Sequence, residues 1–383
     1  MRLTINRQAF LKALTFVNQA IPSKSAESQF MNYLIECNDN NVSIIGSDGD
    51  ISTKVSIGRK NAEGEDVIFD LQTGLVQTPA KYLLDIVSKL GGNVITLNMV
   101  DTNYLNISDD VSTFNLITQP GIEYPNVDLN VPESKNGFKV TFEELRSLYE
   151  TTAFAVASKG PKELFTGINV KAHDGKLCFL ATDSFRMAKY AVPEEDQDAE
   201  FSFTSPVKAL AMACKISETG SIEIYFDEQR AIFVSENVVL STRLIKGEFP
   251  SIDKIIPNSF PYQVKVSTSE FLSAADRVKI ISSAEGKIAQ VRLTLSKETG
   301  VTLSSKSTNY GDSQEVLKTA VLTLPEEENV FEIGFNIDYI IDAVKALKSD
   351  EFTFVFASAI RMFMVTNDDK ENVQILTPIR LSR

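Results

Sequence analysis

The chain has 383 residues, of which 43% are hydrophobic and 23% charged, and its formal net charge is −13. This length suggests two or three globular domains, and the composition is typical of soluble globular proteins. No apolar run approaches the roughly 20 residues that span a bilayer. The N-terminal stretch MRLTINRQAFLKAL lacks the apolar core of a secretion signal. We therefore expect a cytoplasmic protein without a membrane segment.

Residues that carry covalent or metal chemistry are scarce. The cysteines, Cys37, Cys178 and Cys214, are widely spaced and are predicted to be small buried hydrophobes, not a disulfide framework or a zinc site. The only histidine, His173, lies in the polar turn KAHDGK, and nothing near it resembles a nucleophile elbow. Neither of the glycine-rich phosphate-binding motifs G-x-x-x-x-G-K-[ST] and G-x-G-x-x-G is present. The sequence predicts no catalytic residue, metal or cofactor.

An alternative reading uses the acidic residues. The stretch SDGD carries Asp48 and Asp50 and looks like a metal loop, but it lacks the spacing of a calcium site. We interpret it as a plain turn. A cytosolic enzyme that hydrolyses its substrate with metal held by residues such as Asp48, Asp50 and Asp183 is not excluded by composition alone, although no clustered ligand spacing supports it. An acidic scaffold that binds other proteins and no nucleic acid is a further alternative.

A repeat organises the chain. Three segments open with a short alternating strand and then an amphipathic helix: MRLTINRQAFLKALTFVNQAI, GFKVTFEELRSLYETTAFAVAS and YQVKVSTSEFLSAADRVKIISSA. In the first, Phe10, Leu14 and Val17 share one helix face, as Phe271, Ala275 and Val278 do in the third. A second strand–helix–strand unit follows in each copy. Gly91 and Gly220 come after two of its helices, where left-handed caps are common.

The period of roughly 130 residues predicts three similar α+β domains. We expect them at 1–129, 130–259 and 260–383. The boundaries near Leu129 and Phe260 fall in the proline-containing polar stretches VDLNVPESKNG and IIPNSFP.

The net charge argues at first against nucleic acid, because phosphate contacts need lysine and arginine. The predicted helices, 6–20, 78–91, 141–158, 205–217, 268–283 and 336–349, nevertheless hold 11 basic and 8 acidic residues. They carry +3, and the remainder of the chain carries −16. Ordinary solvated helix faces would also give this pattern. The sharper interpretation is a shared helix surface that faces an anionic partner.

Several motifs, in the right order and in the right repeats, resemble the bacterial DNA polymerase III beta subunit family along essentially the whole chain. They are EYPNVD (123–128), ATDSFRMA (181–188), KGEFPSIDKIIP (246–257) and ILTPIRL (375–381). The resemblance implies three clamp domains per chain. It also implies a homodimer closed head to tail into a six-domain ring, with helices inside and sheets outside. Such a ring encircles duplex DNA without sequence preference and confers processivity without catalysis.

The resemblance implies a peptide-binding pocket between the second and third domains. Its partners would be the DNA polymerase III alpha-type polymerase, the clamp loader, repair polymerases and other proteins with clamp-binding peptides. A concave apolar patch with a basic rim suits such peptides. The matching positions are Phe165, Thr182, Ser184, Phe185, Arg186, Met187, Pro250, Lys254, Ile255, Ala359, Arg361, Ile375, Leu376, Pro378, Ile379, Arg380 and Leu381. From the residues alone, Ile375, Leu376 and Ile379 would be read as a last strand packed on the core.

The resemblance also implies a dimer interface and a DNA-facing surface. The interface would pair Phe114 and Leu116 with Ile280 and Ile281. Because neighbours on a helix cannot share one face, we expect one of the two isoleucines to point outward. The DNA-facing candidates are Lys12, Lys24, Lys81, Lys89, Lys162, Lys208 and Lys215, with Lys287 as a further loop candidate.

The sequence departs from the family at the predicted pocket. Phe185 stands where many members have histidine, and Thr377, Pro378 and Ile379 replace Met-Pro-Met. Ser382 and Arg383 extend past the usual terminal leucine. These changes predict an altered peptide preference and leave open a divergent paralogue that serves repair or a mobile element.

Overall fold

The computed structural model describes residues 1–101, 103–132, 136–159, 162–251, 256–257, 259–284, 286 and 288–381. The chain divides into two compact units. One comprises Met1–Glu143 with Lys208–Leu244, and the other Glu144–Val207 with Ile245–Arg383. Within the described residues, no helix is long and apolar enough to cross a membrane.

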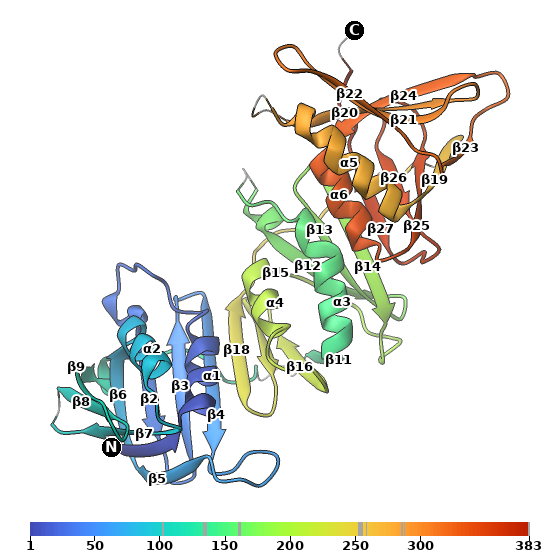
Figure 1. Cartoon of the computed structure of the whole chain (residues 1–383). Coiled ribbons are helices and arrows are strands. Elements are labelled where there is room, and N and C mark those ends of the chain that lie inside the picture. Colours follow the sequence, from blue (N-terminus) through green and yellow to red (C-terminus); the bar gives the residue numbers. More distant parts are fainter. Residues whose placement is uncertain are drawn as a thin grey trace. The chain divides into compact units, whose positions relative to one another are not determined.

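The first unit contains two antiparallel sheets (Figure 1). The five-stranded sheet has the order β5 (Ile68–Gln72), β1 (Arg2–Asn6), β7 (Val94–Met99), β8 (Tyr104–Ser108) and β9 (Thr113–Ile117). The nine-stranded sheet has the order β10 (Gln119–Pro120), β6 (Gly74–Pro79), β2 (Asn32–Cys37), β3 (Asn41–Ser47), β4 (Ile51–Gly58), β18 (Val238–Arg243), β17 (Arg230–Val234), β16 (Ser221–Phe226) and β11 (Gly137–Thr141).

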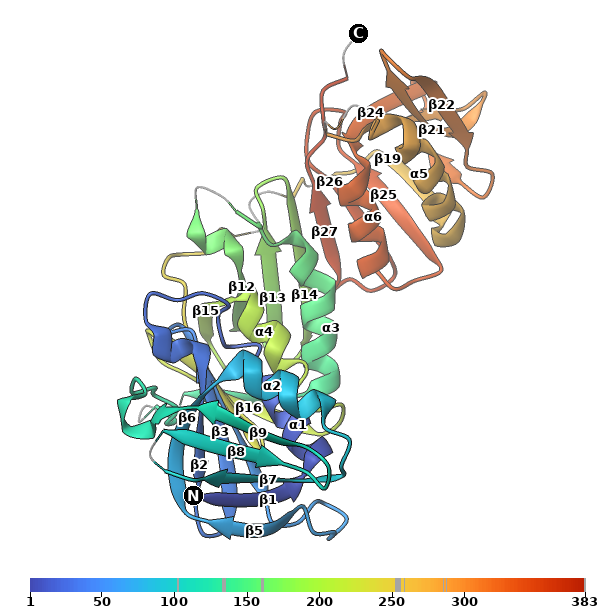
Figure 2. The ribbon, with the colours of Figure 1, turned by 60° about the vertical axis from the view of Figure 1, so that its left-hand side comes forward.

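Helices α1 (Arg7–Val17) and α2 (Ala80–Lys89) lie side by side in this unit (Figures 1 and 2). The helix α4 (Val207–Ala213) and the short 3₁₀ helices η1 (Ser28–Met31) and η2 (Gly121–Glu123) complete it. The side chain of Asn6 accepts a hydrogen bond from the Ala9 amide and so caps α1. Phe10, Leu14 and Val17 are buried together, as their spacing predicts.

The second unit also contains two antiparallel sheets. The nine-stranded sheet has the order β15 (Phe201–Pro206), β12 (Gly167–His173), β13 (Lys176–Thr182), β14 (Arg186–Pro193), β27 (Val373–Leu376), β26 (Phe363–Thr366), β25 (Glu351–Phe356), β19 (Tyr262–Ser267) and β23 (Val321–Thr323). The four-stranded sheet has the order β22 (Gly311–Val316), β21 (Gly300–Ser307), β20 (Gln290–Ser296) and β24 (Val330–Asn336).

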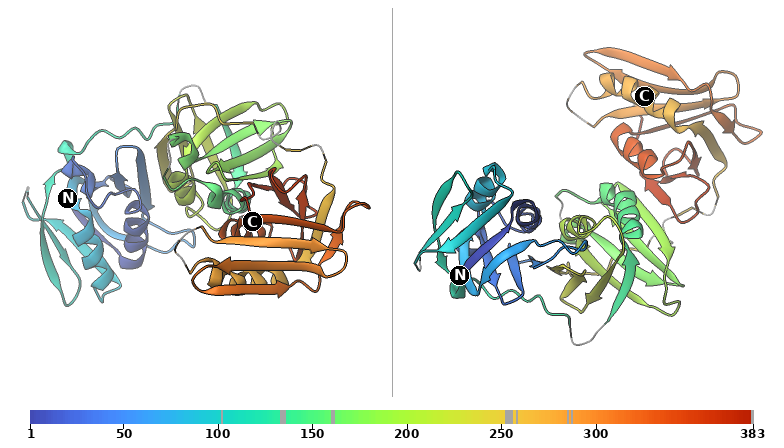
Figure 3. Two further views of the ribbon diagram at one scale, coloured as in Figure 1. Left: turned by 90° about the horizontal axis from the view of Figure 1, so that it is seen from above. Right: turned by 60° about the horizontal axis from the view of Figure 1, so that its bottom comes forward.

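Helices α5 (Thr268–Ser282) and α6 (Ile337–Ala346) contact each other in this unit, beside the strands of its C-terminal part (Figure 3). The unit also holds most of α3 (Phe142–Thr152) and the 3₁₀ helices η3 (Ala153–Ala155) and η4 (Glu163–Thr166). The alternating residues Phe352, Phe354 and Phe356 of β25 are buried, with the Phe271 ring 5.2 Å from that of Phe352. Each such ring contributes roughly 1.5–3 kcal/mol of burial free energy.

The two units do not correspond one to one with the three predicted domains, because each unit pairs strands that are far apart in the chain. In the first unit β4 pairs with β18, so that Val55 stands opposite Val238. In the second unit β14 pairs with β27, so that Met187 stands opposite Ile375. Both sheets therefore run on from the middle third of the sequence into a flanking third.

The six predicted helices are present in the described residues, and each of them is shorter than predicted. The two predicted glycine caps are wrong. Gly91 does not have a positive φ, and Gly220, at φ +85°, lies in the turn before β16, well beyond the end of α4 at Ala213. The amides of Gly91 and Gly92 instead donate to the Asp109 carboxylate, at 3.1 and 3.0 Å.

Candidate functional site

A pocket of about 210 Å³ opens in the second unit, where η4, the β13–β14 turn and the strands β26 and β27 meet. It is lined by Lys162, Phe165, Thr182, Ser184, Phe185, Arg186, Met187, Pro250, Met362, Ile375 and Thr377. The lining is mostly apolar with a few polar groups, which is the usual character of sites that bind peptides or small molecules.

The apolar floor of the pocket joins residues from several strands. Cys178, Leu180, Met187, Ala191 and Ile375 form one buried cluster, against which Phe249, Ile256, Met362, Met364 and Val373 pack. At one side the rings of Phe165 and Phe249 meet edge to face, 6.0 Å apart. Methionines and aromatic rings present a surface that adapts to different apolar anchors.

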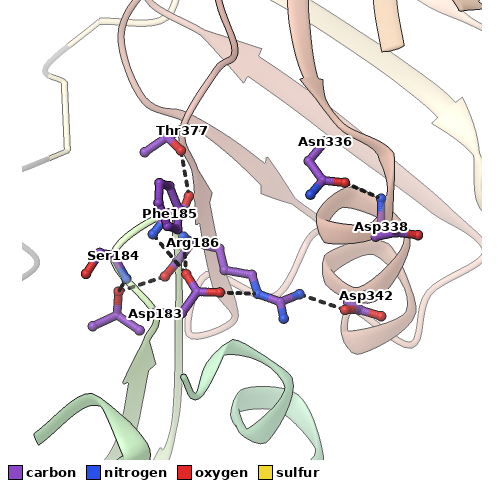
Figure 4. Close-up of polar contacts among 9 residues, drawn as sticks. Asp183, Ser184, Phe185, Arg186, Asn336, Asp338, Asp342 and Thr377 are labelled. Carbon is purple, nitrogen blue, oxygen red and sulfur yellow. Dashed lines mark hydrogen bonds and ion pairs between the residues drawn. The ribbon is translucent and has the colours of Figure 1, made fainter. Parts of the chain in front are cut away.

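The turn between β13 and β14 is held in shape by its own side chains (Figure 4). Asp183 accepts hydrogen bonds from the amides of Phe185 and Arg186, both at 2.9 Å. The Thr182 hydroxyl donates to the Arg186 carbonyl at 2.7 Å and accepts from the Ser184 amide at 3.1 Å. Ser184 has φ +81°, a conformation that non-glycine residues rarely adopt. This bonding presents the Phe185 side chain, 58% exposed, at the pocket.

Arg186 lies in an aromatic and acidic cluster. Its Nε lies 3.0 Å from Asp183 and its Nη1 2.6 Å from Asp342 of α6 (Figure 4). The guanidinium lies 4.4 Å from the ring centroid of Tyr339 and 5.2 Å from that of Phe154. Arginine suits such a place because its flat cation stacks on rings while its edge binds carboxylates. Arg186 thus connects the pocket turn to α6.

A second connection crosses from the turn to the segment after β27. Both the amide and the hydroxyl of Thr377 donate to the Phe185 carbonyl, each at 2.9 Å. Thr377 is one of the positions at which the sequence is predicted to depart from the family, and the second of these two bonds depends on its hydroxyl.

The predicted pocket residues divide into three groups. Those that line the pocket are Phe165, Thr182, Ser184, Phe185, Arg186, Met187, Pro250 and Ile375. Those that lie elsewhere are Ala359, Arg361, Leu376, Pro378, Ile379, Arg380 and Leu381. Lys254 and Ile255 lie outside the described residues, as do Ser382 and Arg383.

The residues that lie elsewhere have other contacts. Leu376 is buried in the core of the C-terminal third. Ala359 and Arg361 are exposed in the loop before β26. The terminal segment lies along β24, where the Ile379 amide donates to the Gly334 carbonyl at 2.7 Å. A Cβ at Gly334 would come within 2.6 Å of the Ile379 carbonyl oxygen, so glycine permits this close approach.

Three lining residues escaped the pocket prediction: Lys162, Met362 and Thr377. Strand alternation could have identified Thr377 as a lining residue. Residues two apart share one face of a strand, and Ile375 was already predicted to line the pocket. Lys162 was expected to face DNA. Its ammonium group lies 5.2 Å from the ring centroid of Phe165, so it stands at the pocket.

The predicted interface residues lie at open sheet edges or on exposed helix surface. Phe114 and Leu116 are on β9, the edge strand of its sheet, opposite the buried residues Ile107 and Leu105. Phe114 is 41% exposed. Ile280 on α5 is 70% exposed, and Ile281 is partly buried. The expectation that one of the two isoleucines points outward is confirmed.

The other predicted DNA-facing lysines are all exposed. Lys208 forms an ion pair with Asp48 at 2.8 Å, and Lys215 donates to Gln19 at 3.3 Å. Lys287 lies outside the described residues. The helices as the structure bounds them hold nine basic and eight acidic residues, a net +1. The predicted +3 is therefore too high, because Lys215 and Lys348 lie beyond the ends of α4 and α6.

Asp48 and Asp183, two acidic residues of the alternative metal-site interpretation, both accept hydrogen bonds from backbone amides of turns. Asp48 accepts from the amides of Asp50 and Ile51, as a turn residue does. The one described group with metal-ligand character is His173, Asp174 and Glu200, all exposed, in which His173 Nδ1 lies 2.6 Å from Glu200. The three cysteines are buried and free, as predicted, and burial raises the pKa of the Cys37 thiol to about 11.

Three family models match the chain in succession. They describe the N-terminal, central and C-terminal domains of the DNA polymerase III beta subunit, at residues 1–128, 139–251 and 253–380. The beta sliding clamp of Bacillus subtilis is 28% identical over 99% of this chain and 100% of its own length. The beta sliding clamp of Staphylococcus aureus is 28% identical over 99% of both chains.

Solved structures agree. The sliding clamp of Bacillus subtilis superposes with a TM-score of 0.91 at 26% identity and covers both chains completely. The beta chain of Streptococcus pneumoniae gives a TM-score of 0.91 at 26% identity, over 99% of this chain and 100% of that one. The chain therefore belongs to the DNA polymerase III beta subunit family, the beta sliding clamps, and is a non-catalytic processivity subunit for DNA replication.

Proposed function

We propose that two copies of this chain join head to tail into a ring that encircles duplex DNA in the cytoplasm, and that the pocket docks peptide segments of the polymerase and other partners. The three clamp domains of each chain would be those predicted, at 1–129, 130–259 and 260–383.

The observation that carries the ring is a pair of unlike open edges, one in each unit. The strand β9 ends the five-stranded sheet and presents Phe114 and Leu116. The strand β22 ends the four-stranded sheet beside α5, which presents Ile280 and Ile281. Open edges with exposed apolar side chains invite pairing with another chain. Because the two edges differ, pairing of one with the other is head to tail, and it closes if the rotation between copies permits.

The pocket suits a short extended peptide with one or two apolar anchors. Its floor is apolar, and Lys162 supplies positive charge at its lining, whereas the charge of Arg186 is neutralised by Asp183 and Asp342. Partners with such tails would include the alpha-type replicative polymerase, the clamp loader and repair polymerases. Arg361, Pro378, Ile379, Arg380 and Leu381 would then belong to an outer part of the same surface.

Retention on DNA tests the ring. The protein is loaded onto nicked circular DNA by a clamp loader, washed at several hundred millimolar salt, and the circle is then cut. Phosphate contacts weaken steeply with salt, whereas enclosure does not. Survival of the wash on circles with release on cutting supports the ring. Equal loss from circular and linear DNA, when a known clamp loads normally, contradicts it.

Peptide binding tests the pocket separately. A fluorescent peptide from the tail of the same cell's replicative polymerase should bind the full chain and be displaced by the unlabelled peptide. Met187→Asp places a charge on the floor of the pocket and should abolish binding, whereas Ile122→Ser alters an exposed isoleucine (87% exposed) of the first unit, outside the pocket lining, and should not. Failure of this tail to bind, with another clamp-binding peptide binding well, would favour a divergent paralogue.

A further inference from the structure

The cations of α1 and α2 differ in their pairing from the cations of α5 and the cation just beyond α6, while Lys208 of α4, also in the first unit, is paired with Asp48. Lys12 of α1 and Lys81 and Lys89 of α2 are exposed. In the part of the chain that the structure describes, none of them has a carboxylate within ion-pair distance. Lys12 lies away from the buried stripe of α1, and Lys81 and Lys89 lie away from that of α2. These three charges are therefore available to an anion in solution.

In the second unit, both cations of α5 are paired with carboxylates. Arg277 of α5 binds Glu315 with two hydrogen bonds of 2.9 and 2.8 Å. Lys279 of α5 lies 2.5 Å from Asp338 of α6. The hydrogen bond that Lys279 donates to the Asp338 carboxylate is the largest cause of the raised pKa of Lys279.

The end of α6 shows the same pattern. Lys348, just beyond the helix, lies 2.7 Å from Glu150 of α3. Lys345 is exposed, but it shares α6 with Asp338 and Asp342, which leaves that helix with a net negative charge.

The net charges of the helices follow this division. Helix α1 carries two cations, Arg7 and Lys12, and no acid, and α2 is also net positive. Helix α5 is neutral, and α6 is net negative. A cation with a carboxylate in contact has almost no field at the distance of a Debye length, about 8–10 Å. An unpaired lysine keeps its attraction for phosphate.

We propose that the chain meets duplex DNA unevenly: phosphates are contacted by the unpaired lysines Lys12, Lys81 and Lys89 of the first unit, while α5 and α6 are electrostatically self-neutralised and contribute no phosphate contact. This inference rests on the proposed ring and refines its DNA-facing surface. Only a part of the lining of such a ring attracts DNA. The ring therefore displaces few counterions from the DNA phosphates and slides with little resistance.

The test compares three variants of the full-length protein with wild type by fluorescence anisotropy on a short linear duplex, over a series of salt concentrations. The first variant, Lys12→Gln/Lys81→Gln, removes two unpaired cations. The second, Lys139→Gln/Lys306→Gln, removes the same charge from exposed strand lysines that lie between buried neighbours. The third removes two complete ion pairs without changing net charge: Lys279→Gln/Asp338→Asn with Lys348→Gln/Glu150→Gln.

Each lost phosphate contact lowers the slope of log affinity against log salt by about 0.9. We expect the first variant to lower the slope by about one or more, and the other two to keep the wild-type slope. An unchanged slope in the first variant overturns the proposal. The proposal is also overturned if the slope of the ion-pair variant falls as much as the slope of the first variant. Circular dichroism of each variant separates lost contacts from lost folding.

The proposed ring is judged by a different readout, the retention of wild type on circular DNA after a salt wash. If wild type is not retained on circles while Lys12→Gln/Lys81→Gln still lowers the linear-duplex slope, the ring fails and the lysine assignment stands. If wild type is retained but the slope does not change, the ring stands and the assignment fails.

Discussion

Nη1 of Arg186 lies 2.6 Å from Oδ2 of Asp342, which joins the turn of the candidate peptide pocket to helix α6. The same guanidinium binds Asp183, whose side chain is 12% exposed, and stacks on Tyr339. Because Asp183 also holds two amides of the turn, the arginine and the turn depend on one carboxylate. The shape of the pocket and the position of α6 are therefore coupled through a single side chain.

Replacement of Arg186 by alanine should lower the free energy of unfolding by about 3 kcal/mol, because it leaves the shielded Asp183 carboxylate without its cation. Asp342 is 43% exposed, so Asp342→Asn should cost about 1 kcal/mol or less. Arg186→Lys keeps the positive charge but not the forked guanidinium, so its loss in the free energy of unfolding should lie between the losses of the other two variants. Urea unfolding followed by circular dichroism measures all three. An Arg186→Ala chain as stable as wild type would show that the cluster does not hold the turn.

Thr377→Val should weaken the link between the turn and the segment after β27. The variant loses the hydrogen bond from the hydroxyl to the Phe185 carbonyl but keeps the hydrogen bond from the backbone amide. We therefore expect the free energy of unfolding to fall by about 1 kcal/mol. Peptide affinity should fall together with thermal stability, because Phe185 lines the pocket. Thr377→Ser keeps the hydroxyl and is the matched control. Equal thermal stability and equal peptide affinity of the valine and serine variants would show that the Thr377 hydroxyl does not stabilise this link.

The repeat and its helices could be predicted because burial imposes a period that is visible in the sequence. Phe10, Leu14 and Val17 needed only helical spacing. The division into two units could not be predicted in this way. It depends on pairing between strands as distant as β4 and β18, and each strand carries the same alternating pattern whichever partner it has.

The pocket was predicted only in part, because the motifs do not show which face of a strand each residue occupies. Its motif residues in the β13–β14 turn and at Ile375 were found through the resemblance. Leu376 was placed in the pocket by the motif, yet strand alternation directs it to the opposite face and into the core. The cap after α2 was mispredicted because a side chain distant in sequence, Asp109, satisfies the amides that follow this helix, and Gly220 was mispredicted because α4 already ends at Ala213.

Asp109 gives a prediction for pH. It accepts from the amides of Ser112, Val111, Gly92 and Gly91, and these bonds lower its pKa from 3.8 to about 2. A group whose pKa is depressed by folding stabilises the fold above its unfolded pKa, and this stability is lost as the pH falls toward the folded value. Wild type should thus lose stability between about pH 4 and pH 2 in part through Asp109.

Asp109→Ala is the variant that isolates this contribution. Its melting temperature should lie below that of wild type by a constant interval between pH 5 and 8, and the interval should narrow below about pH 4 and close near pH 2. Asp109 precedes β9, so the variant should also weaken self-association at neutral pH. An interval that persists at pH 2 would assign the effect to packing instead of the carboxylate.

Ile280→Ser should separate folding from assembly. The side chain is 70% exposed on α5, so its replacement should change the stability of the fold by no more than about 0.5 kcal/mol. If Ile280 packs against β9 of a second copy, the same change removes an apolar contact from the interface and shifts the chain toward monomer in sedimentation experiments. Ile360→Ser, at 78% exposed, is the matched control and should remain a dimer. Monomeric Ile280→Ser should also lose retention on circular DNA while it still binds the polymerase peptide, because the pocket lies within one chain. A dimer unaffected by Ile280→Ser and by Phe114→Ser would place the contact between copies elsewhere on the chain.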